Sequence, residues 1–411
     1  MSDTALSAKR VALVNPRWDF SESRYWACTE THLPLELLYS QALLEAEGIE
    51  TLVVDAHLED LSPNELAARV GEFQPGFIVL TTAPSYLFWR CCPPELDVPA
   101  VASALLQHVA PVVAIGPHGS ATPGYVLEQL ACAAVVRGEP EEELVRLARE
   151  SPTTATVFRD MGGSQPPSKP AVVDVSRLPA LDYSQYPLEK RVHRHHIFWG
   201  EGKGAEAEFS RGCPYGCNFC NRRFFRGSYR ERPVEVVLSE MRALRDRGVD
   251  YVYFIDEIFG LGRCSALLEA LARDPFMQFG CETRIDLWDE ARLDTLAAAG
   301  CVSVEFGLES PFPDVQTSLN KGYRINGDRI LEILTYAKGR IPWVQGDMME
   351  APDSSEELQL RTEEWRQEAI SRGVWVSEPI RAFLYPGCDL HDQLIGPLED
   401  NSWHRARDRS G

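Results

Sequence analysis

Short apolar segments alternate with amphipathic segments along the first 150 residues of the chain. The ranges 33–48 and 61–73 have the apolar spacing of helices, and Ser62-Pro63 supplies a favourable first turn. The apolar runs have the length of buried strands, and they are Arg10–Asn15, Glu50–Asp55, Phe77–Thr82, Val112–Gly116 and Ala133–Arg137. Strands that alternate with helices are typical of a parallel, doubly wound sheet. We therefore predict an α/β domain of this kind at 1–150.

The composition changes at 151–206, where proline, glycine and serine are frequent, and this indicates a linker over the surface. The linker contains His193, His195 and His196. Three histidines suit a metal, but no further ligand has suitable spacing, which favours a solvated or substrate-facing basic patch.

Alternation resumes at 207, with strands predicted at Ala207–Ser210, Tyr251–Ile255, Phe279–Thr283, Ser303–Gly307 and Val344–Met348. Helices are expected at 233–247, 293–299 and 327–338. Roughly six such units are too few for a closed eight-fold barrel. We predict a partial (β/α)6 barrel at 207–355, followed by a C-terminal extension at 356–411 that contains a helix and a strand at 374–384.

Three cysteines lie close together in the segment Cys213-Pro-Tyr-Gly-Cys217-Asn-Phe-Cys220. The chain has 11 cysteines, and an odd number in a long chain is poor evidence for a disulfide framework. Structural zinc and iron–sulfur sites usually have four protein ligands. Three thiolates leave one iron of a 4Fe–4S cluster open to a small chelating molecule, such as the amino acid end of S-adenosylmethionine (SAM). A zinc knuckle without a nearby fourth ligand is the alternative.

The cysteine segment follows a predicted strand, which is where parallel α/β folds place their active sites. It resembles the CxxxCxxC signature of the radical SAM superfamily. The resemblance implies that Cys213, Cys217 and Cys220 hold a 4Fe–4S cluster and that Phe219 lies near the adenine of SAM.

Further segments resemble the later strands of that superfamily. Asp256 and Glu257 match an acidic motif that meets the SAM amino group, and their alternative role is to cap the next helix. The resemblance gives Arg284 and Glu309 to the SAM carboxylate and ribose, although either residue fits a structural ion pair equally well. Met349–Ser354 departs from the usual Gly-x-Pro-Gly-Glu-Thr turn, so that edge of the site is expected to be remodelled.

The first domain resembles the Rossmann-like domain of the cobalamin-binding class of radical SAM proteins. The matching residues lie where its strands end: Asn15, Pro16, Thr82, Pro84, Ser85, Gly116, His118, Gly119, Gly138 and Glu139. The Asp-x-His-x-x-Gly motif that supplies a lower histidine ligand to cobalt is absent. Asp55 and His57 follow the second strand instead, with Asp60 in place of the glycine. We expect no histidine on the lower face of cobalt, with Tyr86, Leu87 or Trp89 covering it.

These features predict a radical SAM enzyme that transfers a methyl group from cobalamin to an unactivated carbon by way of a 5′-deoxyadenosyl radical. Cyclisation, rearrangement or deoxygenation with the same cofactors is the alternative, and a non-catalytic iron–sulfur sensor is an alternative from another class. A methylthiotransferase would need three more cysteines in its first domain, and Cys28, Cys91, Cys92 and Cys132 are poorly placed for that role.

Charge and hydropathy restrict the partners of the protein. The formal net charge of −20 repels phosphate backbones and argues against nucleic acid. No apolar run reaches the roughly 20 residues of a membrane span, and the N-terminus lacks a signal-peptide pattern, so a cytoplasmic location is expected. A small metabolite or natural-product precursor is the expected substrate. A flavodoxin or ferredoxin is the expected electron donor.

Overall fold

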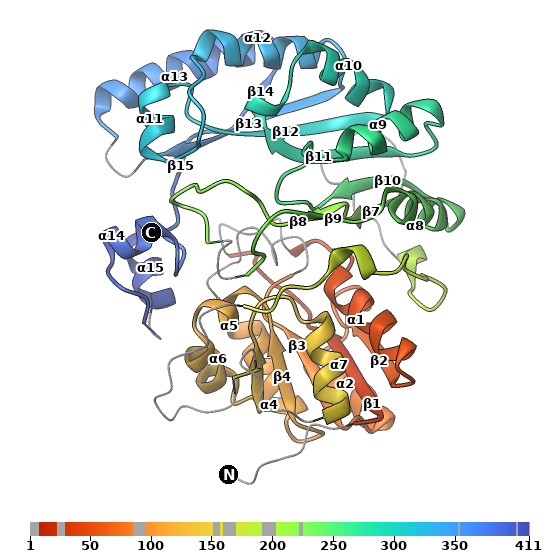
Figure 1. Ribbon diagram of the computed structural model, residues 1–411. Coiled ribbons are helices and arrows are strands. Elements are labelled where there is room, and N and C mark those ends of the chain that lie inside the picture. The colour runs from red at the N-terminus through yellow and green to blue at the C-terminus, as the bar shows by residue number, and fades with distance from the viewer. Residues whose placement is uncertain are drawn as a thin grey trace.

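The computed structural model describes residues 8–22, 29–84, 95–150, 157–158, 170–190, 203–221, 225–351, 354–399 and 402–410. These residues form two α/β domains, each built on its own sheet (Figure 1). No helix within the described ranges is long and apolar enough to cross a membrane.

The first sheet has the strand order β2-β1-β3-β4-β5-β6. Its strands are β1 (Arg10–Asn15), β2 (Glu50–Asp55), β3 (Phe77–Thr81), β4 (Val112–Ile115), β5 (Ala134–Val136) and β6 (Val157–Phe158). The first five are parallel, and only β6 is antiparallel to its neighbour. The strand order reverses direction between β1 and β3, and open sheets of this kind bind ligands at such a switch point. Asn15 and Thr82 lie at this point.

Two groups of helices cover this sheet. One contains α1 (Leu35–Ala46) and α7 (Glu141–Glu150), which pack against each other. The other contains α2 (Pro63–Phe73), α4 (Asp97–Leu106) and α6 (Pro123–Leu130), with the short α5 (Pro117–Ala121) before α6. The predicted doubly wound arrangement of this domain is therefore present, and its strands lie within one or two residues of their predicted bounds.

The second sheet has the order β14-β13-β12-β11-β10-β7, and every pairing in it is parallel. Its strands are β7 (Lys203–Ala207), β10 (Val249–Phe254), β11 (Gln278–Arg284), β12 (Cys301–Glu309), β13 (Trp343–Glu350) and β14 (Trp375–Val376), and β15 (Ile380–Arg381) also pairs with β13. Since β7 and β14 end the path without meeting, this is an open, partial barrel, as predicted.

Helices connect the strands of the barrel and lie on its outer side (Figure 1). They are α8 (Val234–Asp246), α9 (Cys264–Arg273), α10 (Glu290–Ala298), α11 (Pro313–Ser318), α12 (Gly327–Lys338) and α13 (Glu356–Ser371). The extension ends in α14 (Asp389–Leu394) and α15 (Ser402–Ser410).

Three predicted boundaries are wrong. The strand expected at Ala207–Ser210 is β7, which ends at Ala207, and the chain then forms the two-residue strand β8 (Ser210–Arg211) paired with β9 (Arg230–Glu231). The range 151–206 is not only a linker, because β6 and most of β7 lie in it. The strand expected at 374–384 is divided into β14 and β15 around Pro379, which has no backbone N–H to pair.

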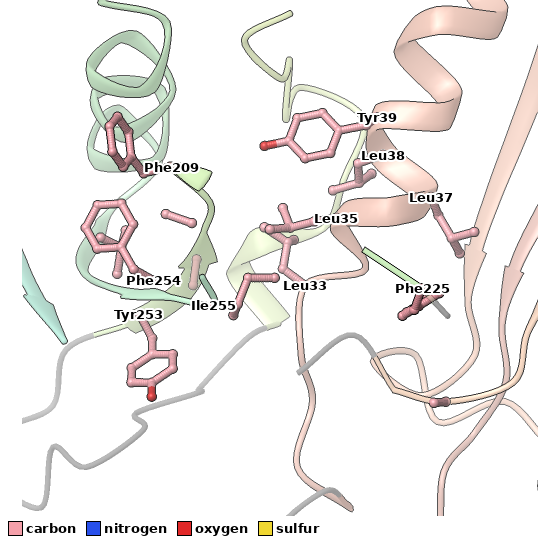
Figure 2. Packing of buried hydrophobic residues seen from close by; sticks show 14 of the residues in the cluster. Leu33, Leu35, Leu37, Leu38, Tyr39, Phe209, Phe225, Tyr253, Phe254 and Ile255 are labelled. Atoms are coloured by element: carbon pink, nitrogen blue, oxygen red, sulfur yellow. The ribbon is translucent and has the colours of Figure 1, made fainter. Parts of the chain in front are cut away.

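The two domains share one continuous apolar core. Leu33, Leu35 and Tyr39 of the first domain lie in the same buried cluster as Phe209 and Ile255 of the barrel, and Figure 2 shows these side chains at the junction. Tyr39 also joins a polar group there, since its hydroxyl contacts Glu240 at 3.1 Å and receives a bond from Arg232 at 2.6 Å. The domains are therefore packed as one body and not joined by the linker alone.

A buried charged network forms the second part of the junction. Its carboxylates are Glu139 and Glu141 from the first domain and Glu208 and Glu257 from the barrel, and its guanidinium groups are Arg211, Arg226 and Arg230. Buried charges are tolerated only when they are paired in this way. We call this set the junction network.

Candidate functional site

The cysteine loop, residues 213–220, follows a glycine that no other residue can replace without strain. Gly212 has φ +77°, and a Cβ atom there would lie 2.4 Å from the carbonyl oxygen of Ser228. Beyond it, the backbone N–H of Asn218 donates to the Leu319 carbonyl at 3.2 Å, and the N–H of Leu390 donates to the Asn218 carbonyl at 2.9 Å. The loop is therefore held between the segment after β12 and the C-terminal extension.

The three cysteines of this loop form no disulfide with the described residues, and all three are partly exposed. Within the described ranges, no three His, Cys, Asp or Glu side chains converge as ligands of a single metal ion. A 4Fe–4S cluster differs from a single ion because each thiolate binds a different iron atom, so the sulfurs stay apart. A donor set of three thiolates in one loop fits a 4Fe–4S cluster with one iron left open.

Asp256 and Glu257 hold the backbone that leads into the cysteine loop. Asp256 is 1% exposed and accepts hydrogen bonds from the N–H groups of Phe209 at 3.0 Å and Ser210 at 2.5 Å and from the Ser210 hydroxyl. Burial raises the pKa of Asp256 to about 7, although these hydrogen bonds act in the opposite direction. Glu257 accepts from the Gly212 N–H at 2.7 Å and pairs with Arg226 at 2.9 Å.

The alternative role for this acidic pair, capping the next helix, is wrong. The N-cap of α9 is Arg263, and no side chain caps that helix. Instead, the pair fixes the entry to the cysteine loop from the end of β10.

Arg284, Glu309 and Phe219 meet around Lys321. Its segment Leu319–Gly322 resembles the loop that follows the fourth strand in the radical SAM superfamily, but Lys321 was not predicted as a site residue. The Lys321 amino group pairs with Glu309 at 2.6 Å and lies 6.0 Å from the centre of the Phe219 ring. The backbone carbonyl of Lys321 accepts a hydrogen bond from Arg284 at 2.6 Å. Arg284 also pairs with Asp286 at 2.9 Å and lies 3.9 Å from Cys217 Sγ. Both residues that were given to SAM therefore form ion pairs, and both lie beside the cysteine loop.

A cavity of about 410 Å³ opens next to Glu309, at the ends of β12 and β13. Its lining includes Ser310, Met349, Glu350 and residues of α13 such as Arg366. Met349–Ala351 belong to the segment whose departure from the usual turn predicted remodelling. Pro352 and Asp353 lie outside the described residues.

The strand ends of the first domain form internal networks. The Asn15 amide donates to Asp55 at 2.8 Å and accepts from the Trp18 indole at 2.8 Å, while Pro16 lines a pocket of about 480 Å³ that also contains His57. Asp55 accepts a further bond from the Tyr186 hydroxyl at 2.5 Å. The Asp55–His57 segment therefore belongs to the packing between β1, β2 and the linker.

The C-terminal extension covers the end of β4. His118 is fully buried, lies 3.2 Å from the Thr82 hydroxyl, and packs against the Trp403 ring with the ring centres 4.6 Å apart. The Trp403 indole donates to the Thr122 hydroxyl at 2.9 Å. Gly116 begins α5, and a Cβ atom on Gly119 would lie 2.3 Å from Val135 Cγ1. No pattern in the sequence predicts the contact between His118 and Trp403, because it joins segments almost 300 residues apart.

The end of β5 faces the barrel. Gly138 has φ +83°, and a Cβ atom there would lie 2.3 Å from the Ala171 carbonyl oxygen. Glu139 reaches Arg230 and belongs to the junction network, which also contains Arg211 just before the cysteine loop. Pro84 is buried at the end of β3. Ser85, Tyr86, Leu87, Trp89, Cys91, Cys92 and the three linker histidines lie outside the described residues.

Comparison with solved structures supports this architecture. The methyltransferase TsrM from Kitasatospora setae, a radical S-adenosylmethionine enzyme solved with tryptophan substrate and a SAM analogue bound, has a TM-score of 0.73 at 18% identity over 93% of this chain and 75% of its own. OxsB, a cobalamin-dependent S-adenosylmethionine radical enzyme, has a TM-score of 0.68 at 17% identity over 98% of this chain and 56% of its own.

Sequence comparison points the same way. The chain is 26% identical over 305 residues to an uncharacterized methyltransferase, PH0819, of Pyrococcus horikoshii, which covers 70% of this chain and 63% of that protein. It is 23% identical over 396 residues to the anaerobic magnesium-protoporphyrin IX monomethyl ester cyclase of Rubrivivax gelatinosus, which covers 89% of this chain and 67% of that protein. The chain thus spans about two thirds of the length of each relative. Residues 207–351 match the family model of the radical SAM superfamily, so this part of the chain contains a radical SAM domain.

Proposed function

We propose that this enzyme is a cobalamin-dependent methyltransferase that acts on a small molecule. The observation that carries the proposal is the contact between Glu139, at the end of β5, and the arginines that flank the cysteine loop. This contact joins the end of β5 to the arginines around the cysteine loop, which supports a shared site between the first domain and the barrel. A methyl carrier and a radical source must share one water-excluded cavity to act on the same carbon.

In this proposal Cys213, Cys217 and Cys220 hold a 4Fe–4S cluster, and the loops at the switch point, with Asn15, Pro16, Thr82, Pro84 and Ser85, hold cobalamin. The cluster supplies the electron that cleaves SAM, and cobalamin supplies the methyl carrier. In the proposal Gly116, His118, Gly119, Gly138 and Glu139 also belong to this cobalamin site. His118 is packed against Trp403, and Glu139 is paired with Arg230 of the barrel.

The protein residues position the reactants. Asp256 and Glu257 fix the start of the cysteine loop through backbone N–H groups. Glu309 and Phe219 both lie close to the Lys321 amino group, and in the proposal they line the region that takes the amino acid end and the adenine of SAM. The names of the relatives are consistent with this chemistry, since PH0819 is named a methyltransferase and TsrM is described as one with tryptophan as substrate.

Radical cyclisation is the second candidate, and it is favoured by the similarity to the Rubrivivax cyclase, which extends over 89% of this chain. The two reactions differ in the fate of the methyl group of SAM. The test is anaerobic incubation of the reconstituted enzyme with cobalamin, methyl-labelled SAM and fractionated metabolite extracts. Label in a new product supports methyl transfer, while an unlabelled product that appears with 5′-deoxyadenosine supports cyclisation. Failure to cleave SAM at all would favour the iron–sulfur sensor.

A further inference from the structure

Arg284 is the last residue of β11 and is 6% exposed. Its guanidinium group is engaged along one edge, where Nε and Nη2 donate to the two carboxylate oxygens of Asp286 at 2.9 and 3.1 Å. Nη2 also donates to the Lys321 carbonyl at 2.6 Å. Three of the five N–H bonds of this side chain therefore have protein acceptors.

Two tyrosine rings pack against the guanidinium group as well. The Tyr215 ring centre lies 3.6 Å from Arg284 Cζ, and the Tyr323 ring centre lies 4.8 Å from it. Tyr215 belongs to the cysteine loop itself, between Cys213 and Cys217. Stacking of this kind holds an arginine in one orientation. The side chain is therefore fixed to the loop and is poorly suited to close around a mobile ligand.

The remaining corner of the group points to a cysteine. Nη1 lies 3.9 Å from Cys217 Sγ, a long donor–sulfur contact, while Asp286 binds the opposite Nε–Nη2 edge. The positive end of the ion pair therefore faces the sulfur. Hydrogen bonds and charges at the cysteine sulfurs set the potential of iron–sulfur clusters.

We infer that Arg284 is a positioning residue that raises the reduction potential of the cluster on Cys213, Cys217 and Cys220. Reduction adds one electron from the external donor to the cluster and moves no proton, so the cluster becomes more negative. A cation beside Cys217 stabilises that reduced form more than the oxidised form. This inference rests on the cluster assignment in the proposed function. It gives Arg284 the cluster at Cys217 as its partner, in place of the SAM carboxylate.

The test is an anaerobic redox titration of the reconstituted enzyme, followed by electron paramagnetic resonance of the reduced cluster. In Arg284→Gln we expect the ratio of reduced to oxidised cluster at a fixed potential to fall about ten-fold, which is about 59 mV for a one-electron couple. Arg284→Lys retains the charge, so its reduction potential should fall by less than half as much as that of Arg284→Gln. Arg329→Gln is the matched control, because Arg329 is also paired with carboxylates but lies on the exposed side of α12.

Asp286→Asn supplies a second variant in case Arg284→Gln does not retain its cluster. Removal of that counter-charge should move the potential upward, opposite to Arg284→Gln. Potentials equal to that of the wild type in cluster-containing Arg284→Gln, or in Asp286→Asn, would overturn the inference and leave the proposed function standing. Unchanged potentials with weakened SAM binding would return Arg284 to the SAM carboxylate. A wild-type protein that binds no cluster would overturn both.

Discussion

Glu139 and Arg230 form a two-pronged ion pair across the junction of the domains, with each carboxylate oxygen 2.8 Å from a different guanidinium nitrogen. The Glu139 side chain is fully buried, and the Arg230 side chain is 18% exposed. The same carboxylate accepts the N–H of Val173 at 2.5 Å. One side chain thus joins the end of β5, the linker and the strand beside the cysteine loop.

Glu139→Gln should therefore destabilise the protein strongly. The change removes the carboxylate that pairs with Arg230 across the junction, and breaking a buried ion pair in this way costs about 3–5 kcal/mol. Chemical denaturation followed by circular dichroism measures the loss. Glu50→Gln is the control, since Glu50 pairs with Arg10 on the surface and should cost less than about 1 kcal/mol. Equal losses in the two variants would contradict a special role for Glu139.

Replacement of Cys213, Cys217 and Cys220 together by alanine should abolish cluster binding, because these three thiolates are the proposed protein ligands of the cluster. Iron and sulfide counting after anaerobic reconstitution measures the result. Cys301→Ala removes a buried thiol on β12, away from the loop, and should keep the full iron content. A triple variant that retains four irons would refute the assignment.

The stability of the protein should depend on the protonation of Asp256. Its folded-state pKa is about 7 against 3.8 for the free group, so the folded state holds this proton more tightly than the unfolded state. The contribution of this proton is complete below about pH 4 and is lost as the pH rises through 7. Asp256→Asn should therefore gain stability relative to the wild type as the pH rises from about 4 to about 7. Denaturation curves at several pH values test this, and parallel pH dependences would disagree with it.

Trp403→Ala should release the C-terminal extension from the first domain. Trp403 is 1% exposed, and truncation of a buried tryptophan costs about 3–5 kcal/mol. Limited proteolysis should then cleave the extension faster than in the wild type. Leu360→Ala, at a position 67% exposed on α13, is the control and should leave the rate unchanged. An unchanged cleavage rate in Trp403→Ala would show that other contacts hold the extension.

The strands that could be predicted from the sequence are those whose apolar runs are continuous. Arg10–Asn15 and Glu50–Asp55 were predicted to the residue, because each run ends at a polar group that the structure uses at the strand end. The start of the barrel was misplaced because β7 carries a buried glutamate. Glu206 is tolerated there because it pairs with His32 and the N–H of Leu33, which lie 174 and 173 residues earlier.

The same limit applies to the site. The acidic pair after β10 was visible as a motif, but its partners are the backbone N–H groups of Phe209, Ser210 and Gly212, and backbone groups leave no mark in a sequence. The role of Lys321 depends on the loop after β12 folding back to the cysteine loop. The spacing of residues along the chain does not predict that this loop contacts the cysteine loop.

The C-terminal extension contacts both halves of the proposed site, through Leu390 on the cysteine loop and Trp403 on His118. A ribosome makes these residues about 170 positions after the cysteines and almost 300 after the end of β4. During synthesis the end of β4 and the cysteine loop are therefore made well before the segment that packs on them. The contacts of Leu390 and Trp403 can therefore close over these two regions only after α14 and α15 have been made.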